Sequence, residues 1–266
     1  MNDDFAHPMA QACLLIIEVG NSHVSVASAI DGVVRAESRF THGEIWQAVD
    51  YAGEVWDALP DDRARAIAAA SVVPAVFQDL QGRMQERLTQ EVLVVGRDLH
   101  RPMSIALEAP ELVGIDRICA AAAAYETARR ACAVASFGTA ITIDCVNDEG
   151  AFLGGAILPG FYLQAHALAE GTAALPEVSV EETGHVYGVD TQEAIRNGVL
   201  YGAAGALREI TERYATDLGA WPLLIVTGGG AELMRRHCDF IDHVVPDLVL
   251  RGIALAYRRH FAPLEE

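Results

Sequence analysis

Two short turns of small and polar residues follow apolar runs and have the composition of phosphate-binding turns. The first, Gly20-Asn21-Ser22, comes after the apolar run 14–17, and the second, Gly138-Thr139-Ala140, comes after the apolar run 131–135. Such turns expose backbone N–H groups and a hydroxyl with no bulky side chain in the way, and these groups bind phosphate. The repeated pattern predicts a duplicated domain with a nucleotide held between the two copies.

A third glycine turn, Gly228-Gly229-Gly230, follows the apolar run 223–226 and precedes a predicted helix. Because it lies directly before a helix, we expect this turn to lie beneath a nucleoside. Most glycine turns are only turns. The recurrence of all three after equivalent strands, rather than any one of them, supports a nucleotide site.

Asp116 and Arg117 are the candidates for proton transfer and anion binding. They follow Gly114 at the start of a predicted helix, where an aspartate also satisfies free N–H groups without any catalytic role. In the functional interpretation, Asp116 accepts a proton from an attacking hydroxyl and Arg117 binds an anionic substrate through two hydrogen bonds. A kinase needs such a base near the γ-phosphate. Both interpretations stay open on the residues alone.

Glu18 is a candidate metal ligand, whereas we expect no role in the site for Asp144 or the histidines. Glu18 ends the first apolar strand, where a carboxylate can hold Mg²⁺ directly or through water. We expect Asp144 to be a surface residue of a strand. The nine histidines show no H-x-x-x-H or comparable spacing, so we expect them to be structural or solvated.

Composition limits the class of protein. A chain of 266 residues, 52% of them hydrophobic, is long enough for two compact domains with cores. A formal charge of −18 argues against nucleic acid or an anionic membrane as a partner, because both would be repelled. The chain contains no lysine. A Walker-type loop, which needs a lysine on the phosphates, is therefore excluded.

The cysteines and the first residues of the chain indicate a cellular compartment. The five cysteines are scattered without C-x-x-C spacing, and we predict buried free thiols in a reducing cytosol. Residues 1–12 lack the basic cluster of a signal peptide, and no apolar run reaches membrane-spanning length. We therefore expect a cytoplasmic protein.

Apolar periodicity predicts the elements that position these groups. Strands are predicted over 13–18, 22–30, 33–40, 64–73, 92–95, 131–136, 139–146, 151–157 and 223–226. Helices are predicted over 44–59, 76–88, 118–128, 161–170, 191–207 and beyond, from 231 onward, and 248–261, with Thr191 capping the long one. Each half follows the order βββαβαβα. The predicted division is a flexible leader over 1–12, a first domain over 13–128 and a second over 129–266, without a loose linker.

Seven segments resemble the type III pantothenate kinases in order and spacing, over nearly the whole chain. They are 18–22 (EVGNS), 71–74 (SVVP), 110–117 (PELVGIDR), 137–140 (FGTA), 154–160 (GGAILPG), 171–176 (GTAALP) and 227–229 (TGG). The elements G-x-D-R, G-G-A-I-x-P-G and T-A-x-L-P are not general to the superfamily of acetate kinases, sugar kinases, heat-shock 70 proteins and actin. The resemblance implies an α/β fold of duplicated ribonuclease-H-like (actin-like ATPase) domains, each a mixed five-stranded sheet flanked by helices, and a homodimer.

The resemblance also implies a reaction, ATP-dependent phosphorylation of pantothenate to 4'-phosphopantothenate, the first step of coenzyme A biosynthesis. The family's general base corresponds to Asp116. The implied substrate contacts are Gly114, Ile115, Asp116, Arg117 and Thr172. The implied ATP contacts are Glu18, Val19, Gly20, Asn21, Ser22, His23, Val24, Ser25, Thr139, Gly228 and Gly229. Glu18 would hold Mg²⁺, and Ser136 stands where the family binds a monovalent cation, K⁺ or NH₄⁺.

Three residues depart from the family pattern. The first strand of the family normally ends in Asp, and the longer Glu18 misplaces Mg²⁺ unless something compensates. The family has Asp where this chain has Ser136, so the cation requirement is expected to weaken or vanish. The position of Leu107 is often aromatic. These departures leave three hypotheses, which are an active pantothenate kinase, a catalytically impaired homologue that binds a ligand or regulates, and a kinase for another small hydroxy acid or amide.

Overall fold

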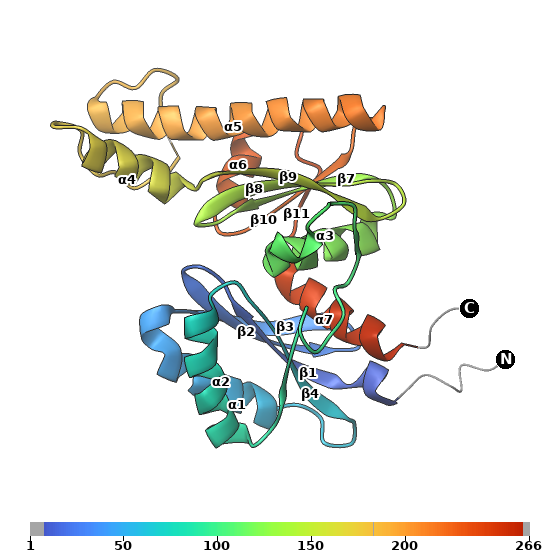
Figure 1. Ribbon diagram of the computed structural model, residues 1–266. Coiled ribbons are helices and arrows are strands. Elements are labelled where there is room, and N and C mark those ends of the chain that lie inside the picture. Colours follow the sequence, from blue (N-terminus) through green and yellow to red (C-terminus); the bar gives the residue numbers. More distant parts are fainter. Residues whose placement is uncertain (1–7, 183, 263–266) are drawn as a thin grey trace. The chain divides into compact units, whose positions relative to one another are not determined.

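The computed structural model describes residues 8–182 and 184–262 (Figure 1). Contacts between Cα atoms divide the chain into two compact units. Unit 1 takes in the chain up to Ser104, the segment Glu108–Ala123 and the chain from Asp247, whereas unit 2 comprises Ile105–Leu107 and Ala124–Pro246. Each unit is built around one sheet.

The sheet of unit 1 has five strands in the order β3-β2-β1-β4-β5. Strand β1 (Cys13–Val19) pairs antiparallel with β2 (His23–Ile30), which pairs antiparallel with β3 (Val33–Thr41). On its other side β1 pairs in parallel with β4 (Arg65–Ser71), and β4 pairs in parallel with β5 (Val92–Val94). This is the mixed five-stranded sheet that was predicted.

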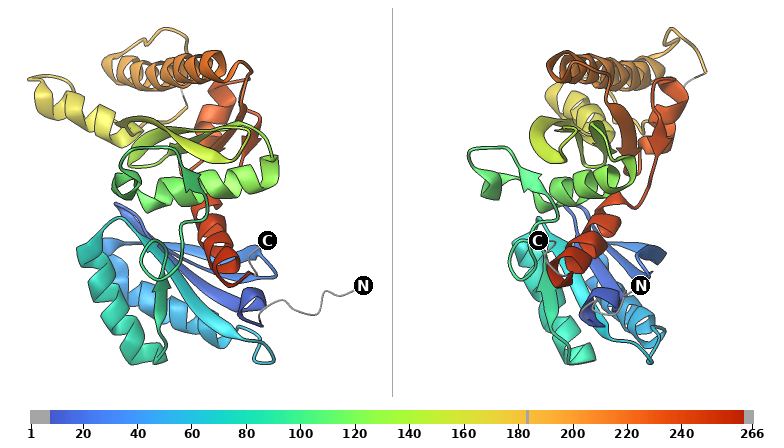
Figure 2. Two further views of the ribbon diagram at one scale, coloured as in Figure 1. Left: turned by 45° about the vertical axis from the view of Figure 1, so that its right-hand side comes forward. Right: turned by 90° about the vertical axis from the view of Figure 1, so that its right-hand side faces the viewer.

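Helices cover both faces of this sheet. Helices α1 (Ile45–Asp57) and α2 (Pro74–Leu88) pack on one face, and α7 (Leu248–Phe261) packs on the other (Figures 1 and 2). Along β1, Leu15 packs toward α1 and α2 while Ile16 packs toward α7. Both faces are therefore apolar, which explains why β1 reads as an unbroken hydrophobic run rather than an alternating one.

Helix α7 groups with unit 1, although the sequence division assigned 248–261 to the second domain. The reason is packing, because Leu250, Ile253 and Tyr257 are buried in the same apolar cluster as β1 and β4. A short 3-10 helix, Pro8–Gln11, contacts α7. This part of the predicted leader over 1–12 is thus packed structure, and residues 1–7 lie outside the described residues. The domain boundary at 128/129 stays a prediction.

The sheet of unit 2 repeats the arrangement of unit 1. Strand β7 (Cys132–Phe137) pairs antiparallel with β8 (Ala140–Val146), which pairs antiparallel with β9 (Ala151–Pro159). On its other side β7 pairs in parallel with β10 (Leu223–Thr227), and β10 in parallel with β11 (His243–Val244). Five strands thus have the same order and directions as those of unit 1. The predicted duplication is confirmed.

Two features of unit 2 differ from the prediction. A sixth strand, β6 (Ser104–Ile105), extends the sheet beside β9. Neither β6 nor β11 was predicted, because two residues are too few to show an alternating pattern. Helix α5 (Thr191–Leu218) begins after Asp190, whose side chain accepts a hydrogen bond from the Glu193 N–H. The predicted cap, Thr191, is wrong, since it is the first helical residue.

The remaining helices complete the fold. Helices α5 and α6 (Ala231–His237) pack on one face of the unit 2 sheet, and α4 (Phe161–Gly171) contacts α5 (Figure 1). Helix α3 (Ile115–Ala128) follows a 3-10 turn, Pro110–Leu112, and a further 3-10 turn, His42–Glu44, precedes α1. Burial of all five cysteines as free thiols is confirmed. Over residues 8–182 and 184–262, no helix combines the length and the hydropathy needed to cross a bilayer.

Candidate active site

The first predicted phosphate turn lies between β1 and β2 in unit 1. The Gly20 N–H donates to the His23 carbonyl at 2.9 Å and closes the turn. A ring nitrogen of His42 lies 3.0 Å from the Gly20 carbonyl oxygen. A Cβ atom built on Gly20 would lie 3.6 Å from Glu18 Oε1. The structure thus brings the Glu18 carboxylate directly beside the turn.

Two polar side chains lie in register with Glu18 on the neighbouring strands β2 and β3. Ser25 of β2 is directly opposite Glu18, and its hydroxyl donates a hydrogen bond to the Glu18 carboxylate. Arg39 of β3 is opposite Ser25 and forms an ion pair with Glu37 at 2.8 Å. Directly paired residues point to one face of a sheet. Glu18, Ser25 and Arg39 therefore form a polar row, which we call the β1–β3 row.

The other residues of this turn that are predicted to contact ATP differ in whether their side chains are buried or exposed. Val19 and Val24 have side chains buried in the core, so only their backbone groups face the turn. Asn21 and His23 are exposed, and Ser22 is half-buried. The turn can therefore offer the polar side chains of its tip to a phosphate.

Asp116 lies in the first turn of α3, where its carboxylate folds over Gly114. A Cβ atom built on Gly114 would lie only 2.6 Å from Asp116 Oδ1. The Gly114 carbonyl accepts a hydrogen bond from the Ile118 N–H at 3.3 Å. Ile115, Asp116 and Arg117 are all half-buried. Glycine at position 114 thus leaves room for the aspartate carboxylate, which a larger residue would displace.

The negative charge of Asp116 acts on the Glu18 carboxylate. Burial raises the pKa of Glu18 to about 7, and the negative charge of Asp116 adds to that rise. The charge of Arg39 and the hydrogen bond from Ser25 act in the opposite direction, so they favour the ionised carboxylate. The pKa of the Cys119 thiol is also raised, chiefly by burial and further by Asp116 and Glu18. The three side chains therefore lie in one region of unit 1.

The other two glycine turns, at Gly138 and at Gly228, lie next to each other in unit 2. The Gly230 N–H donates to the Phe137 carbonyl at 3.0 Å, and the Gly138 N–H donates to the Ala140 carbonyl at 3.1 Å. Gly228 has a φ of +88°, and a Cβ atom there would lie 2.6 Å from the Phe137 carbonyl oxygen. The turn at Gly228 thus packs against the backbone that enters the turn containing Thr139. In contrast, Gly229 has open space around it.

Ser136 lies in a row of hydroxyl side chains. It is paired with Thr142 of β8 and with Thr227 of β10. Ser136 stands two residues before the glycine of its turn, the place that Glu18 has in unit 1. This row offers neutral oxygen atoms where unit 1 offers a carboxylate.

Asp144 is almost fully buried, at 2% exposure, so its prediction as a surface residue is wrong. It is opposite Gly155 of β9, and a Cβ atom there would lie 2.4 Å from Asp144 Oδ1. The carboxylate thus occupies the space left by the missing side chain.

Thr172, predicted to contact substrate, and Leu107, one of the departures from the family pattern, both lie in unit 2. The Thr172 hydroxyl donates to the Leu168 carbonyl at 2.8 Å and accepts from the Leu175 N–H at 3.2 Å. These bonds end α4, so this hydroxyl has a structural use. Leu107 packs beside Gly154, whose φ is +114°.

The carboxylate beside the Gly20 turn fits one kind of metal site, a Mg²⁺ site shared with a nucleotide. Over the described part of the chain, no group of three or more His, Cys, Asp or Glu residues is placed to hold a metal ion. Mg²⁺ at kinase sites uses one or two carboxylates together with substrate phosphates and water. Glu18 beside the glycine turn supplies one such carboxylate. The residues therefore fit a Mg²⁺ ion that binds with a nucleotide.

Two sheets of equal order, each with a glycine turn after its central strand, define the class of protein as the duplicated ribonuclease-H-like fold of actin-like ATPases and sugar kinases. Solved structures share this fold. The hexokinase of the ROK class from Thermus thermophilus is 14% identical, with a TM-score of 0.50 over 92% of this chain and 98% of that one. The ethanolamine utilization protein EutJ from Carboxydothermus hydrogenoformans is 14% identical, with a TM-score of 0.53 over 95% and 93%.

Sequence comparison gives the family. The family model for type III pantothenate kinase matches residues 14–213. A type III pantothenate kinase from Legionella pneumophila (strain Paris) is 36% identical over 252 residues, which cover 91% of this chain and 97% of the relative. One from Dehalococcoides mccartyi is 31% identical over 260 residues, covering 94% and 98%. The chain belongs to the type III pantothenate kinase family and is an enzyme of the kinase class, as the resemblance implied.

Proposed function

We propose that this chain transfers the γ-phosphoryl group of ATP to the hydroxyl of pantothenate, with Asp116 as the general base. Family membership supports the two substrates. The observation that carries the proposal is the Asp116 carboxylate over Gly114, within electrostatic reach of Glu18 in unit 1. One carboxylate is then available for the proton and the other for the metal that accompanies the nucleotide.

In this mechanism the substrate hydroxyl gives its proton to the Asp116 carboxylate. The hydroxyl oxygen bonds to the γ-phosphorus as the bond to the bridging oxygen of ADP breaks. Arg117, the next residue of α3, binds the carboxylate of pantothenate through two hydrogen bonds, and Gly114 and Ile115 contact the same substrate. Thr172, in unit 2, is a further proposed contact to pantothenate, beside the bonds that its hydroxyl makes at the end of α4.

The proposed nucleotide contacts are the turn at Gly20 in unit 1 and, in unit 2, the turns that contain Thr139 and Gly228. Glu18 is the residue that would hold Mg²⁺, which supplies neutralisation of phosphate charge when bound. Ser136 would supply a neutral oxygen to a monovalent cation, so we propose a weak or absent requirement for K⁺ or NH₄⁺.

The homodimer also remains a proposal, and one segment of unit 2 supports it. Val186, Tyr187 and Val189 are 74%, 84% and 70% exposed. A soluble protein rarely presents several large apolar side chains together unless they contact a partner. We place the contact with the second copy on this segment.

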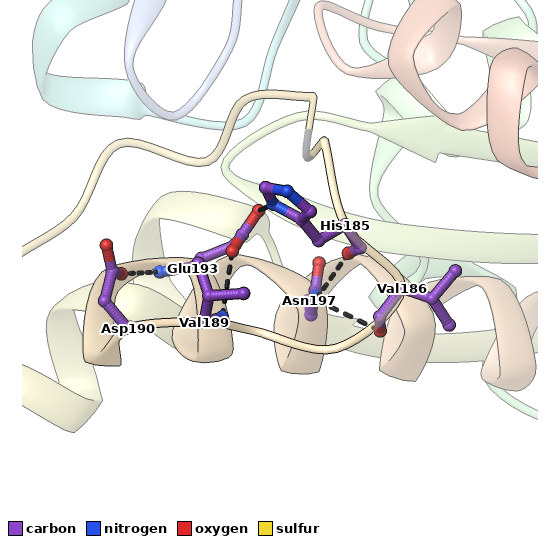
Figure 3. Close-up of polar contacts among 6 residues, drawn as sticks. All are labelled: His185, Val186, Val189, Asp190, Glu193 and Asn197. Atoms are coloured by element: carbon purple, nitrogen blue, oxygen red, sulfur yellow. Dashed lines mark hydrogen bonds and ion pairs between the residues drawn. The ribbon is translucent and has the colours of Figure 1, made fainter.

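Hydrogen bonds to α5 hold this segment in place (Figure 3). The Glu193 carboxylate accepts from the Val189 N–H and lies 2.9 Å from a ring nitrogen of His185. The Asn197 side chain donates to the carbonyls of His185 and Val186. The apolar side chains are thus presented by a fixed backbone. Sedimentation should give a dimer for wild type and for Val33→Arg, but a monomer for Tyr187→Arg; a dimeric Tyr187→Arg would contradict this placement.

A second candidate function follows from the hydroxyl row at Ser136. Without the carboxylate that the family normally has there, the chain would be an impaired homologue that binds ligands without turnover. Mass spectrometry of reactions containing Mg·ATP and pantothenate tests the choice, and phosphopantothenate is the expected product. Nucleotide binding without product would favour the impaired homologue, and product from another hydroxy acid or amide alone would favour a different substrate.

A further inference from the structure

The contact between Ser25 and Glu18 joins the second strand of unit 1 to the carboxylate beside the nucleotide turn. The two residues are directly paired across β1 and β2, and the Ser25 hydroxyl donates to the Glu18 carboxylate. Ser25 is only 4% exposed. A buried hydroxyl that donates to a carboxylate forms a charge-assisted bond, which is stronger than a bond between neutral groups.

This bond acts on a side chain that has freedom to move. Glutamate has one more rotatable bond than aspartate, so a strand-end glutamate needs a partner to keep its carboxylate in one place. Glu18 Oε1 lies 3.6 Å from the position of a Cβ atom on Gly20. The carboxylate is therefore turned toward the glycine turn while Ser25 holds it from the neighbouring strand.

Arg39 has a different part in the β1–β3 row. Its guanidinium group is bound to Glu37 at 2.8 Å, and the residue is exposed. It supplies positive charge near Glu18, but it is already engaged by another carboxylate. Ser25 is almost fully buried, and its hydroxyl is hydrogen-bonded to Glu18.

We propose that Ser25 is a positioning residue, which fixes the Glu18 carboxylate beside the Gly20 turn for Mg·ATP and does not itself touch the nucleotide. This inference rests on the proposed function only in taking Mg·ATP as the ligand. It assigns Ser25 a role different from the nucleotide contact that the resemblance implied. It also identifies what compensates for a glutamate at position 18.

Calorimetric titration with ATP, in Mg²⁺ and separately in EDTA, tests the role without requiring turnover. Ser25→Ala should weaken binding of Mg·ATP about tenfold, the loss typical of one charge-assisted hydrogen bond. Binding of ATP in EDTA should not change. If Ser25→Ala loses equal affinity for ATP with and without Mg²⁺, Ser25 contacts the nucleotide itself and the proposal is overturned. Unchanged affinity for Mg·ATP would also overturn it.

Ser28 offers a matched control on the same strand. It is 8% exposed, and its hydroxyl donates to the Arg35 carbonyl at 3.3 Å rather than to the row. Ser28→Ala therefore removes a similar buried hydroxyl without touching Glu18, and its Mg·ATP affinity should equal that of wild type. A loss equal to that of Ser25→Ala would attribute the effect to the strand in general and contradict the proposal.

A double-mutant cycle tests whether Ser25 acts through Glu18. In Glu18→Asp the shorter arm withdraws the carboxylate from Ser25, so a further Ser25→Ala change should weaken Mg·ATP binding less than twofold. A full tenfold loss in the Glu18→Asp background would overturn the proposal.

Failure of the proposed function can be told apart from failure of this inference. If wild type makes no phosphopantothenate but the binding pattern holds, the proposed function fails and this inference stands. If wild type turns over and Ser25→Ala binds Mg·ATP normally, the inference alone fails.

Discussion

The negative charge of Asp116 raises the pKa of Glu18, second only to burial, so the two carboxylates lie in one electrostatic environment within unit 1. Glu18 comes from the end of β1 and Asp116 from the first turn of α3. One unit therefore carries both the residue proposed for the metal and the residue proposed as base. The glycines at 20 and 114 leave room for these two side chains.

The raised pKa of Glu18 predicts a pH-dependent stability. The pKa rises from 4.5 to about 7 in the folded state, so the folded state holds the proton more tightly than the unfolded state. The stability from this group is present below pH 4.5 and is lost as pH rises through 7. In metal-free buffer, Glu18→Gln should be more stable than wild type at high pH by about 3 kcal/mol and gain little at low pH. Urea unfolding at several pH values measures this, and a difference independent of pH would contradict it.

Gly114→Ala should misplace the proposed base. The new methyl group would lie 2.6 Å from Asp116 Oδ1, so the carboxylate has to move. Displacement of a catalytic group by about 1 Å lowers kcat on the order of 10- to 100-fold. Gly82→Ala, in α2 with open space around it, is the control and should keep the wild-type kcat. Steady-state kinetics that show a normal kcat for Gly114→Ala would exclude this role for the glycine.

Gly252→Ala should loosen the packing of α7 on α3. A Cβ atom at Gly252 would overlap the backbone of Cys119, at 2.0 Å from its carbonyl oxygen, so the two helices would have to separate. Such overpacking costs about 1–3 kcal/mol of the free energy of unfolding. Gly198→Ala is an exposed helical control with open space, and it should raise stability slightly. Equal unfolding free energies for the two variants would contradict this contact.

Helix α5 provides a test of capping. Asp190→Ala removes the side chain that accepts from the Glu193 N–H at 2.8 Å and should cost about 1 kcal/mol of stability. Thr191→Ala changes the next residue without touching that bond, so it should cost much less. Thermal unfolding compares the two variants, and a larger loss for Thr191→Ala would mean that the cap is assigned to the wrong residue.

The sequence was sufficient to predict the elements whose apolar pattern is local. Strands β1 and β7 are buried on both faces and read as unbroken apolar runs, and each is followed by a glycine turn that marks its end. The long helices could be predicted because their apolar positions repeat over several turns. The assignment of α7 to unit 1 could not, because it depends on contacts between distant segments.

The β1–β3 row could not be predicted for a more specific reason. Residues near the hairpin turn pair as Ile30 with Val33 and Ala29 with Val34, and this register continued would place Ser38 opposite Ser25. A bulge between Val26 and Ser28 shifts the pairing by one residue, so Arg39 lies there instead. Since a shift of one residue reverses the facing of every side chain, the row exists only because of the bulge.

The most direct test of the proposed function is phosphopantothenate formation by wild type and Asp116→Asn in Mg·ATP, with and without K⁺ or NH₄⁺. Asn keeps the shape of the side chain but cannot take the proton. We expect wild type to turn over with little dependence on the monovalent cation, and Asp116→Asn to lose at least about 100-fold in kcat while remaining folded. Wild-type turnover that Asp116→Asn retains would contradict Asp116 as base, and no turnover by folded wild type under any cation would contradict the kinase.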